Sequence, residues 1–545
     1  MYVDTLPTEA KFDFIVCGAG SAGCIVAERL SASGEHSVLL IEAGDRDNNI
    51  NIKVPLLVVN LINNPEVTWP YITEPQQNLN GKPQRWTRGR VIGGSGSING
   101  NLFARGDPAE YDNWRNNLGC SGWGYADLLP VFKRMEDFPE GDPALRGRGG
   151  PIHCTRLDQF DKLSSAFVKA CTQAGYRELP DHNDGSYEGA FFLQYSTRKG
   201  FRNNSAAGYL KPASTRRNLT ILTNTVVSKL LMEERTAVGV EMLDTLGSKS
   251  TVRANREVIL SAGPLATPQI LELSGIGQET ILSQHGIPVL NHLPGVGENL
   301  RDHPNTRITF ECSEKITIND MLINPLFKIR EGLRFILKRE GLLTISSSTA
   351  QMNYRSSPDL KQADLVLRLQ PLSGADRYAR KPGTGMDMFP GFTFGITTLQ
   401  PKSIGNLHIQ SKDPRQQARM DPCYLSNQDD AQLFLRGMQI SRGIAAMPAL
   451  KPLVVRETRP GPGVVSDTEM LHYIRNTLQT SWHMVGTCKM GIDAMAVVDP
   501  QLRVHNIKNL RVIDSSICPT LPSSGPAVPT MAIAEKGAEM VLAST

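Results

Sequence analysis

The chain has 545 residues, of which 40% are hydrophobic and 21% are charged, and its formal net charge is +4. This length exceeds what one hydrophobic core usually accommodates, so we expect two domains with room to bury a large cofactor. The nearly balanced, scattered charges argue against nucleic acid and anionic membranes as partners.

The N-terminus and the cysteines indicate the compartment. Residues 1–11 contain acids at Asp4 and Glu9 and no apolar run, which is unlike a secretory signal. No later stretch is long and apolar enough to predict a membrane span. The nine cysteines include no Cys-x-x-Cys pair, a pattern typical of small buried hydrophobes, not of a disulfide framework or a zinc site. We therefore expect a cytoplasmic protein without a bound metal.

The first predicted elements form a dinucleotide-binding turn. A buried strand over 12–17 leads at once into a G-x-G-x-x-G pattern, which opens a helix predicted over 21–30. The first glycine permits a tight turn, the second lets the backbone approach a pyrophosphate, and the third lets the helix pack on the strand. The helix N-terminus then faces the anion. The cofactor contacts expected here are Gly18, Gly20, Ser21, Ala22 and Gly23.

A second strand, over 37–41, ends in Glu42 and Ala43. An acid about twenty residues beyond the glycines is placed to accept hydrogen bonds from the ribose hydroxyls of an adenine dinucleotide. These elements predict a bound dinucleotide but do not choose between FAD and NAD.

Further motifs along the chain resemble one family. Residues Gly89 to Gly106 form a second glycine-rich stretch that is too long for an ordinary turn, and Gly263 to Gly277 follow later. These two stretches resemble the two signatures of the glucose-methanol-choline (GMC) oxidoreductases. Similar matches, in the family's order, occur at 294–303, 399–405, 482–487 and 510–514. The resemblance covers essentially the whole chain, and several long motifs in order are far more specific than any one alone.

The resemblance implies the fold class. It is α/β (α+β overall), with a Rossmann-like FAD-binding domain of discontinuous segments and an inserted substrate domain built on a six-stranded antiparallel sheet. The FAD-binding domain would comprise residues 1–155, 200–305 and 481–545, and the substrate-binding domain residues 156–199 and 306–480. Within the latter, residues 392–399 and 405–410 are predicted to be strands.

The resemblance also assigns residues to FAD. The loop up to Asn101 should pass along the flavin, where backbone amides can stabilise the negative charge of reduced flavin. Val227 matches a valine whose backbone contacts the adenine, although an ordinary strand valine fits the pattern equally well. Asp514 matches an acid that contacts FAD, with a capping role as the alternative. The further expected contacts are Arg90, Gly93, Gly94, Ser95, Asn99, Gly100, Ala262, Gly263, Trp482 and Ser515.

His483 is the candidate catalytic base. Transfer of a hydride from an alcohol carbon requires loss of the hydroxyl proton, and a histidine, with an unperturbed pKa of about 6.5, suits this exchange. Of the ten histidines, His483 alone lies in the family's active-site motif. His303 and His505 also lie in family motifs and are expected to be structural.

Two positions depart from the family pattern. Ile98 stands where some members have a histidine bonded to the flavin, so FAD should be bound non-covalently. Ala527 aligns where a second catalytic histidine or asparagine normally lies, and its side chain cannot form hydrogen bonds. His483 would therefore act alone or with a group elsewhere. The candidate partners are Asn101, Ser523 and Ser524.

These features predict an FAD-dependent alcohol oxidase or dehydrogenase that converts a small primary alcohol to the aldehyde. The sequence fits an aromatic, heteroaromatic, aliphatic or sugar-like substrate. It also leaves open whether oxygen or another molecule accepts the electrons, and which oligomeric state the protein adopts. A redox-silent lyase that cleaves cyanohydrins is the first alternative, and an inactive flavin-binding protein is the second. The basic segment Arg377 to Lys381 could contact an acidic substrate, although a solvated loop is the commoner use of such a segment.

Overall fold

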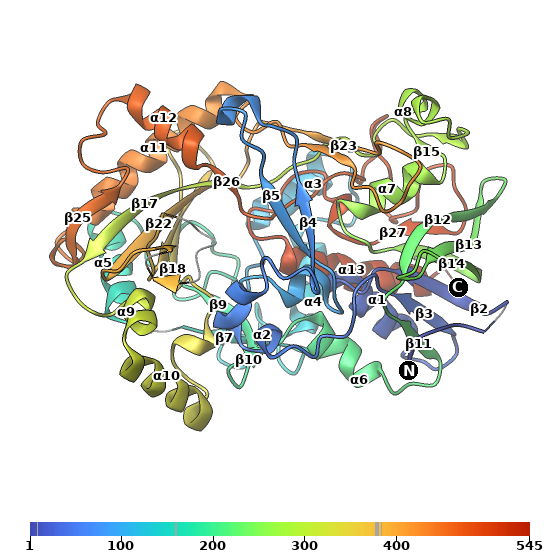
Figure 1. The fold of residues 1–545 in the computed structure, drawn as a ribbon, viewed down its shortest axis with the longest axis horizontal. Coiled ribbons are helices and arrows are strands. Elements are labelled where there is room, and N and C mark those ends of the chain that lie inside the picture. The colour runs from blue at the N-terminus through green and yellow to red at the C-terminus, as the bar shows by residue number, and fades with distance from the viewer. Residues whose placement is uncertain (8, 158–160, 376–380, 383, 545) are drawn as a thin grey trace.

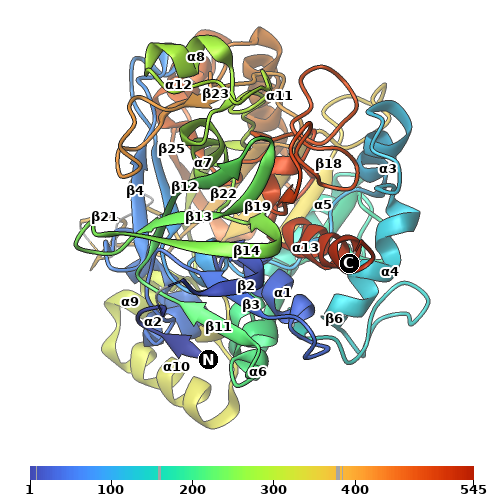
Figure 2. The ribbon, with the colours of Figure 1, turned by 90° about the vertical axis from the view of Figure 1, so that its right-hand side faces the viewer.

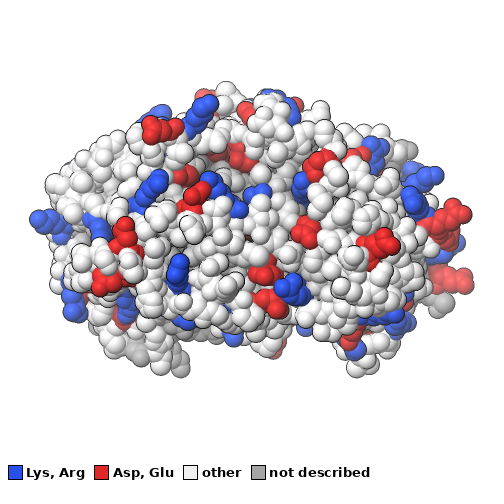
Figure 3. Space-filling view, turned by 90° about the horizontal axis from the view of Figure 1, so that it is seen from above, with Lys and Arg blue, Asp and Glu red and all other residues white. Residues whose placement is uncertain are grey.

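The computed structural model describes residues 1–7, 9–157, 161–375, 381–382 and 384–544. Two large sheets lie side by side along the longest axis of the molecule (Figure 1). Basic and acidic side chains intermingle over the face that Figure 3 shows. Within the described ranges, no helix has the length and apolar character needed to cross a membrane.

The first sheet contains the predicted nucleotide turn. Its strands are parallel except at one edge, where the chain folds back in an antiparallel hairpin. In spatial order they are β1 (Tyr2–Val3), β11 (Leu219–Leu222), β3 (Val38–Ile41), β2 (Lys11–Cys17), β14 (Lys249–Leu260), β13 (Thr236–Leu243) and β12 (Val226–Glu233), with β27 (Leu510–Val512) paired to β14.

Helix α1 (Ser21–Leu30) is buried on nearly every side. It follows β2 directly and packs against the C-terminal helix α13 (Ala527–Leu542), as Figure 2 shows. A helix that is covered all round needs small and apolar residues on every face, and α1 has them in the run Ser-Ala-Gly-Cys-Ile-Val-Ala. The two ends of the chain therefore meet beside the nucleotide turn.

The second large sheet is antiparallel throughout. Its order is β25 (Val454–Arg459), β17 (Pro304–Cys312), β22 (Gly391–Thr398), β19 (Leu365–Gln370), β18 (Ala350–Tyr354) and β8 (Gly189–Phe192), with β26 (Gln479–Thr480) paired to β17. Helices α5 (Lys162–Gln173), α11 (Gln428–Ala445) and α12 (Asp467–Thr477) pack on it and close an apolar core.

Smaller elements connect the two halves. The sheet β10-β9-β7-β6 comprises Phe201–Arg202, Gln194–Arg198, Ile152–Arg156 and Glu136–Asp137, and β4 (Thr68–Ile72) pairs with β5 (Arg85–Gly89). The remaining helices are α2 (Ile50–Lys53), α3 (Pro108–Asn117), α4 (Tyr125–Met135), α6 (Lys211–Ala213), α7 (Ala266–Leu273), α8 (Glu279–Gln284), α9 (Ile318–Ile323) and α10 (Pro325–Lys338). The remaining strands are β15 (Ile276–Gly277), β16 (Asn291–His292), β20 (Lys381–Pro382), β21 (Gly385–Met386), β23 (Asn406–His408) and β24 (Arg419–Asp421).

The fold class implied by the resemblance is confirmed: a mainly parallel sheet built from distant segments accompanies an inserted antiparallel sheet. One predicted strand lies elsewhere. Residues 406–408 pair with β24 and not with the strand formed by 391–398. After that strand the chain turns toward the other half of the molecule, where the Leu407 amide donates to the carbonyl of Gly297.

Candidate functional site

One cavity of about 720 Å³ extends from the nucleotide turn to the antiparallel sheet. It is large enough for a cofactor and a small substrate. All but three of the predicted site residues line it, and they come from both ends of the chain and from segments between. The lining members are Gly18, Gly20, Ser21, Ala22, Glu42, Ala43, Gly94, Ser95, Asn99, Gly100, Asn101, Val227, Ala262, Gly263, Trp482, His483, Asp514 and Ser515.

The three exceptions, Gly23, Arg90 and Gly93, lie just behind this wall. A β-carbon at Gly23 would come within 1.8 Å of the Gly18 carbonyl oxygen, so only glycine allows α1 to pack this closely on the turn. The guanidinium of Arg90 donates to the Ala43 carbonyl (3.3 Å). Gly93 has φ +88° and donates its amide to the backbone of the turn at 2.7 Å.

The two glycine-rich loops contact each other. A β-carbon at Gly94, whose φ is +52°, would lie 2.7 Å from the Cα of Gly20. Beside them, Glu42 accepts hydrogen bonds from the amides of Ala19 and Gly44, each at 2.9 Å. Burial raises the pKa of Glu42 to about 7. The carboxyl group is thus fixed at the strand end, where the motif predicts a ribose contact.

Arg202 supports the second loop from behind. Its guanidinium donates to the Gly96 carbonyl (3.0 Å) and to the side-chain oxygens of Asn99 (2.7 Å) and Asn101 (2.6 Å). These acceptors are neutral, and burial lowers the pKa of Arg202 to about 9. The Asn101 amide nitrogen also donates to the Ser196 carbonyl (3.0 Å). Both ends of the Asn101 amide therefore make structural contacts, which favours a positioning role over a catalytic one.

Asp514 and Val227 both line the cavity. The Asp514 carboxylate accepts hydrogen bonds from the Gly263 amide (2.8 Å), the Thr267 hydroxyl (2.7 Å) and the Ser516 amide (2.8 Å). Asp514 therefore both caps the backbone that follows it and lines the cavity. Val227 lies on the edge strand β12.

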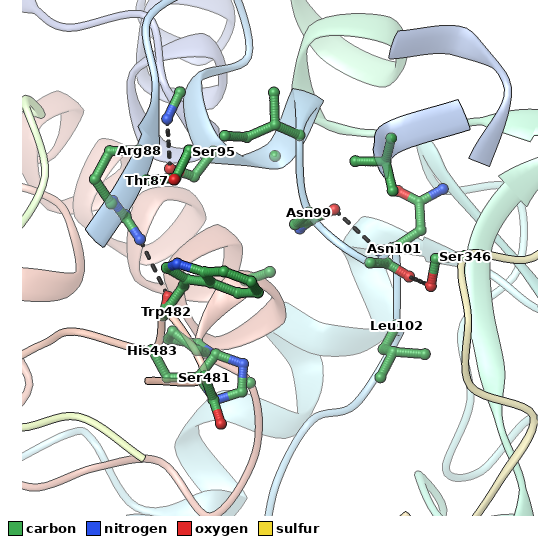
Figure 4. A pocket seen from close by; sticks show the side chains of 18 of the residues that line it. Thr87, Arg88, Ser95, Asn99, Asn101, Leu102, Ser346, Ser481, Trp482 and His483 are labelled. Atoms are coloured by element: carbon green, nitrogen blue, oxygen red, sulfur yellow. Dashed lines mark hydrogen bonds between the residues drawn. The ribbon is translucent and has the colours of Figure 1, made fainter. Parts of the chain in front are cut away.

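Asp302 fixes the backbone of the loop that ends in His483. Its buried carboxylate accepts from the His483 amide (2.8 Å) and from the hydroxyls of Thr480 (2.5 Å) and Tyr424. Trp482 adopts φ +59°, a left-handed conformation that is rare for a bulky residue. Its carbonyl accepts from Arg88 at 3.2 Å (Figure 4). These contacts stabilise the strained turn that directs His483 into the cavity.

His303, expected to be structural, contacts the candidate base directly. Its Nδ1 lies 2.9 Å from Nδ1 of His483, and its Nε2 lies 2.9 Å from the carbonyl oxygen of Leu399. A carbonyl only accepts, so Nε2 of His303 has the proton and its Nδ1 accepts. Burial lowers the pKa of His303 to about 4, which keeps the ring neutral. His483 must therefore donate from Nδ1, and its Nε2 is the proton-accepting nitrogen.

The C-terminal loop approaches this nitrogen. A β-carbon at Gly525 would come within 3.1 Å of Nε2 of His483. Ser523, Ser524 and Ala527 also line the cavity. The Ser523 hydroxyl accepts from Gln400 at 3.3 Å and the Ser524 hydroxyl donates to the Gly525 carbonyl at 3.3 Å. The short loop thus brings small side chains beside the base.

The antiparallel sheet forms the far wall. Strand alternation turns the polar side chains of several strands toward the cavity and the apolar ones toward the helices. The polar wall residues are Gln351, Asn353, Arg368, Gln370, Thr393 and Thr397. The residues predicted from the sequence include none of them, although the period-two pattern of 365–370 indicates a polar face. Residues 377–380 of the basic segment lie outside the described residues.

Comparisons with known proteins agree with this architecture. Two family models, both described as GMC oxidoreductase, match residues 12–305 and 401–534. An oxygen-dependent choline dehydrogenase from Photobacterium profundum is 38% identical over 540 residues, which cover 98% of this chain and 93% of that protein. An alcohol dehydrogenase (acceptor) from Pseudomonas putida is 36% identical over 534 residues, covering 97% and 96%.

Two solved structures are similar throughout. Pyridoxine 4-oxidase from Mesorbium loti has a TM-score of 0.86 and 30% identity, covering 97% of this chain and 98% of that chain. A formate oxidase from Aspergillus oryzae RIB40 has a TM-score of 0.91 and 26% identity, covering 99% of each.

Proposed function

Because this chain belongs to the GMC oxidoreductases, FAD-dependent enzymes that act on CH–OH groups, we propose that it oxidises a small primary alcohol to the aldehyde, with His483 as the base. The observation that supports this most directly is the pair formed by His303 and His483. The pair directs Nε2 of His483, the proton-accepting nitrogen, into the cavity that extends to the nucleotide turn.

The residues at the nucleotide end fit FAD. A β-carbon at Gly18 or Gly23 would clash with the backbone there, and Glu42 is fixed where a ribose would lie. When bound, the flavin supplies the hydride acceptor. Ile98 lines the same cavity, and an aliphatic side chain cannot form a covalent bond to the flavin. We therefore propose non-covalent binding.

His483 would act as follows. Its Nε2 takes the substrate hydroxyl proton as the hydride leaves the carbinol carbon, so the alcohol loses one proton and one hydride and becomes the aldehyde. His303 holds the required tautomer, and Asp302 holds the loop. Ala527 leaves space beside the base, which favours a substrate bulkier than ethanol, such as a ring-bearing alcohol. Oxygen or another carrier would reoxidise the cofactor.

The decisive experiment is anaerobic mixing of the holoenzyme with a panel of alcohols, followed by stopped-flow absorbance of the flavin. We expect bleaching with at least one ring-bearing alcohol. His483→Ala should retain bound FAD but lose roughly a hundredfold or more in reduction rate, because a positioned general base contributes about 10²–10⁴-fold. His505→Ala is the matched control and should reduce normally. Near-normal reduction by the His483 variant would refute the assignment.

The two alternative functions, a lyase and an inactive flavin-binding protein, have less support. None of the relatives named above is a lyase, and a cyanohydrin lyase would release aldehyde without bleaching the flavin. An inactive flavin-binding protein would not require the paired histidines.

We also propose the domain division 1–155, 200–305 and 481–545 against 156–199 and 306–480. The strands of the parallel sheet all lie in the first set, and nearly all residues of the antiparallel sheet lie in the second. The four-stranded sheet crosses the boundary, because β9 pairs with β7.

A further inference from the structure

The cavity wall on the antiparallel sheet contains a cation. Along β19, Val366, Arg368 and Gln370 line the cavity, whereas the alternate residues Leu367 and Leu369 pack in the apolar core. Strand alternation therefore places Arg368 in the same cavity as His483.

Among the described residues, the hydrogen-bond partner and the cross-strand neighbours of Arg368 are neutral. Its Nε donates to Oε1 of Gln351 (2.8 Å), the residue opposite it on β18. On the other side it faces Gly395 of β22, which has no side chain to cover the guanidinium. The phenols of Tyr187 and Tyr195 are the groups whose charge would act on it, and burial raises the pKa of both phenols, which keeps them neutral. No carboxylate of the described residues forms an ion pair with Arg368.

The carboxylates that line the cavity accept hydrogen bonds from other groups. Glu42 binds amides at the nucleotide turn, and Asp514 binds Gly263 and the residues around it. Glu331, on α10, accepts from the Leu342 amide at 3.2 Å. The substrate end of the cavity therefore has a partly buried cation without a counter-ion from the described part of the chain. A charge that is partly removed from water in this way is stabilised when a ligand of opposite charge binds it.

We propose that Arg368 binds a carboxylate of the substrate, so that the substrate class is a primary alcohol bearing an anionic group. The proposal rests on the proposed function and specifies its substrate. A planar guanidinium can donate two parallel hydrogen bonds to a carboxylate, which selects orientation as well as charge. Tyr187 also lines the cavity and is only partly buried, so its ring offers a surface for an aromatic body.

The position of Arg368 relative to the base supports this orientation. Arg368, His303 and His483 line the same cavity, and the charge of Arg368 contributes to the lowered pKa of His303. A ligand with its carboxylate on Arg368 would extend its other end toward the paired histidines. A cationic alcohol such as choline would meet the same positive charge and be repelled.

The test uses benzoate, which has the carboxylate and the ring but no oxidisable hydroxyl. Oxidised holoenzyme is titrated with benzoate, benzyl alcohol or choline, and binding is followed by flavin absorbance and by calorimetry. We expect benzoate to bind most tightly. Arg368→Gln should weaken benzoate binding by about ten- to hundredfold while changing benzyl alcohol binding by less than about threefold. Arg368→Lys should retain part of the affinity.

Lys361→Gln is the matched control, because Lys361 is an exposed cation just before the same strand. It removes an equal charge and should leave benzoate binding unchanged. Equal benzoate affinity in the Arg368→Gln and unmodified proteins would overturn the proposal, as would tighter binding of choline than of benzoate.

A reactive probe completes the test. The unmodified enzyme should prefer 4-(hydroxymethyl)benzoate to benzyl alcohol in kcat/KM, and Arg368→Gln should abolish that preference. The two proposals fail separately. If no alcohol bleaches the flavin while benzoate still binds through Arg368, the proposed oxidation is wrong and the anion site stands. If benzyl alcohol is oxidised normally and the carboxylate has no effect, the anion site is wrong and the oxidation stands.

Discussion

Replacement of His303 by leucine tests whether the tautomer of His483 is set by its neighbour. The variant removes the acceptor at 2.9 Å from Nδ1 of His483. A hydrogen bond between neutral groups contributes about 0.5–1.5 kcal/mol, and leaving the buried Nδ1–H without an acceptor costs about 1–3 kcal/mol. At about 1.4 kcal/mol per factor of ten, the productive tautomer becomes roughly 2- to 100-fold rarer.

The assay is the limiting rate of anaerobic flavin reduction at saturating alcohol. We expect a fall within that range, smaller than for His483→Ala, with little change in substrate affinity. His303→Gln should restore most of the rate, because its side chain can donate to the Leu399 carbonyl and accept from His483. A folded, flavin-loaded His303→Leu enzyme with the normal limiting rate would refute the reasoning. So would equal losses in the leucine and glutamine variants.

Three further outcomes are expected. Denaturation should release all flavin from the polypeptide, because Ile98 cannot form a covalent bond; flavin remaining on the precipitate would contradict this. Ala527→Asn should lower kcat/KM for a ring-bearing alcohol relative to ethanol by filling the space beside the base, and an unchanged ratio would exclude that explanation. His408 is partly buried, which opposes its charge, but hydrogen bonds to Glu272 and Glu298 outweigh this and raise its pKa to about 9. Its contribution to stability should therefore be complete below about pH 6.5 and be lost as the pH rises through 9. Urea unfolding should show this loss, at most about 3 kcal/mol, and His408→Gln should remove the dependence.

Local sequence patterns predict the nucleotide turn closely. The strand expected over 12–17 is found over 11–17, and the helix expected over 21–30 has those bounds. Both follow from neighbouring residues, because glycine spacing and an apolar run fix a turn and a buried strand without distant partners.

The contacts that set the chemistry depend on distant partners. His303 meets His483 across 180 positions of sequence, so its motif alone could not reveal a catalytic neighbour. Arg202 and Arg368 lie in segments whose local pattern predicts only ordinary strands or loops. Which face of β19 meets the cavity is decided by the packing of α11 on the other face, and a single strand's alternation does not specify it.

The meeting of the two chain ends beside Gly18 governs when the protein can acquire its cofactor during synthesis. Strand β2 gains its neighbour β14 only after residue 260 has been made, and α1 gains α13 only at the very end. A ribosome adds about 5–20 residues per second, so one face of the apolar helix stays uncovered for tens of seconds. We therefore expect a growing chain to bind flavin weakly until the residues of α13 have been made. Chaperone demand and flavin supply should both matter most in that last interval.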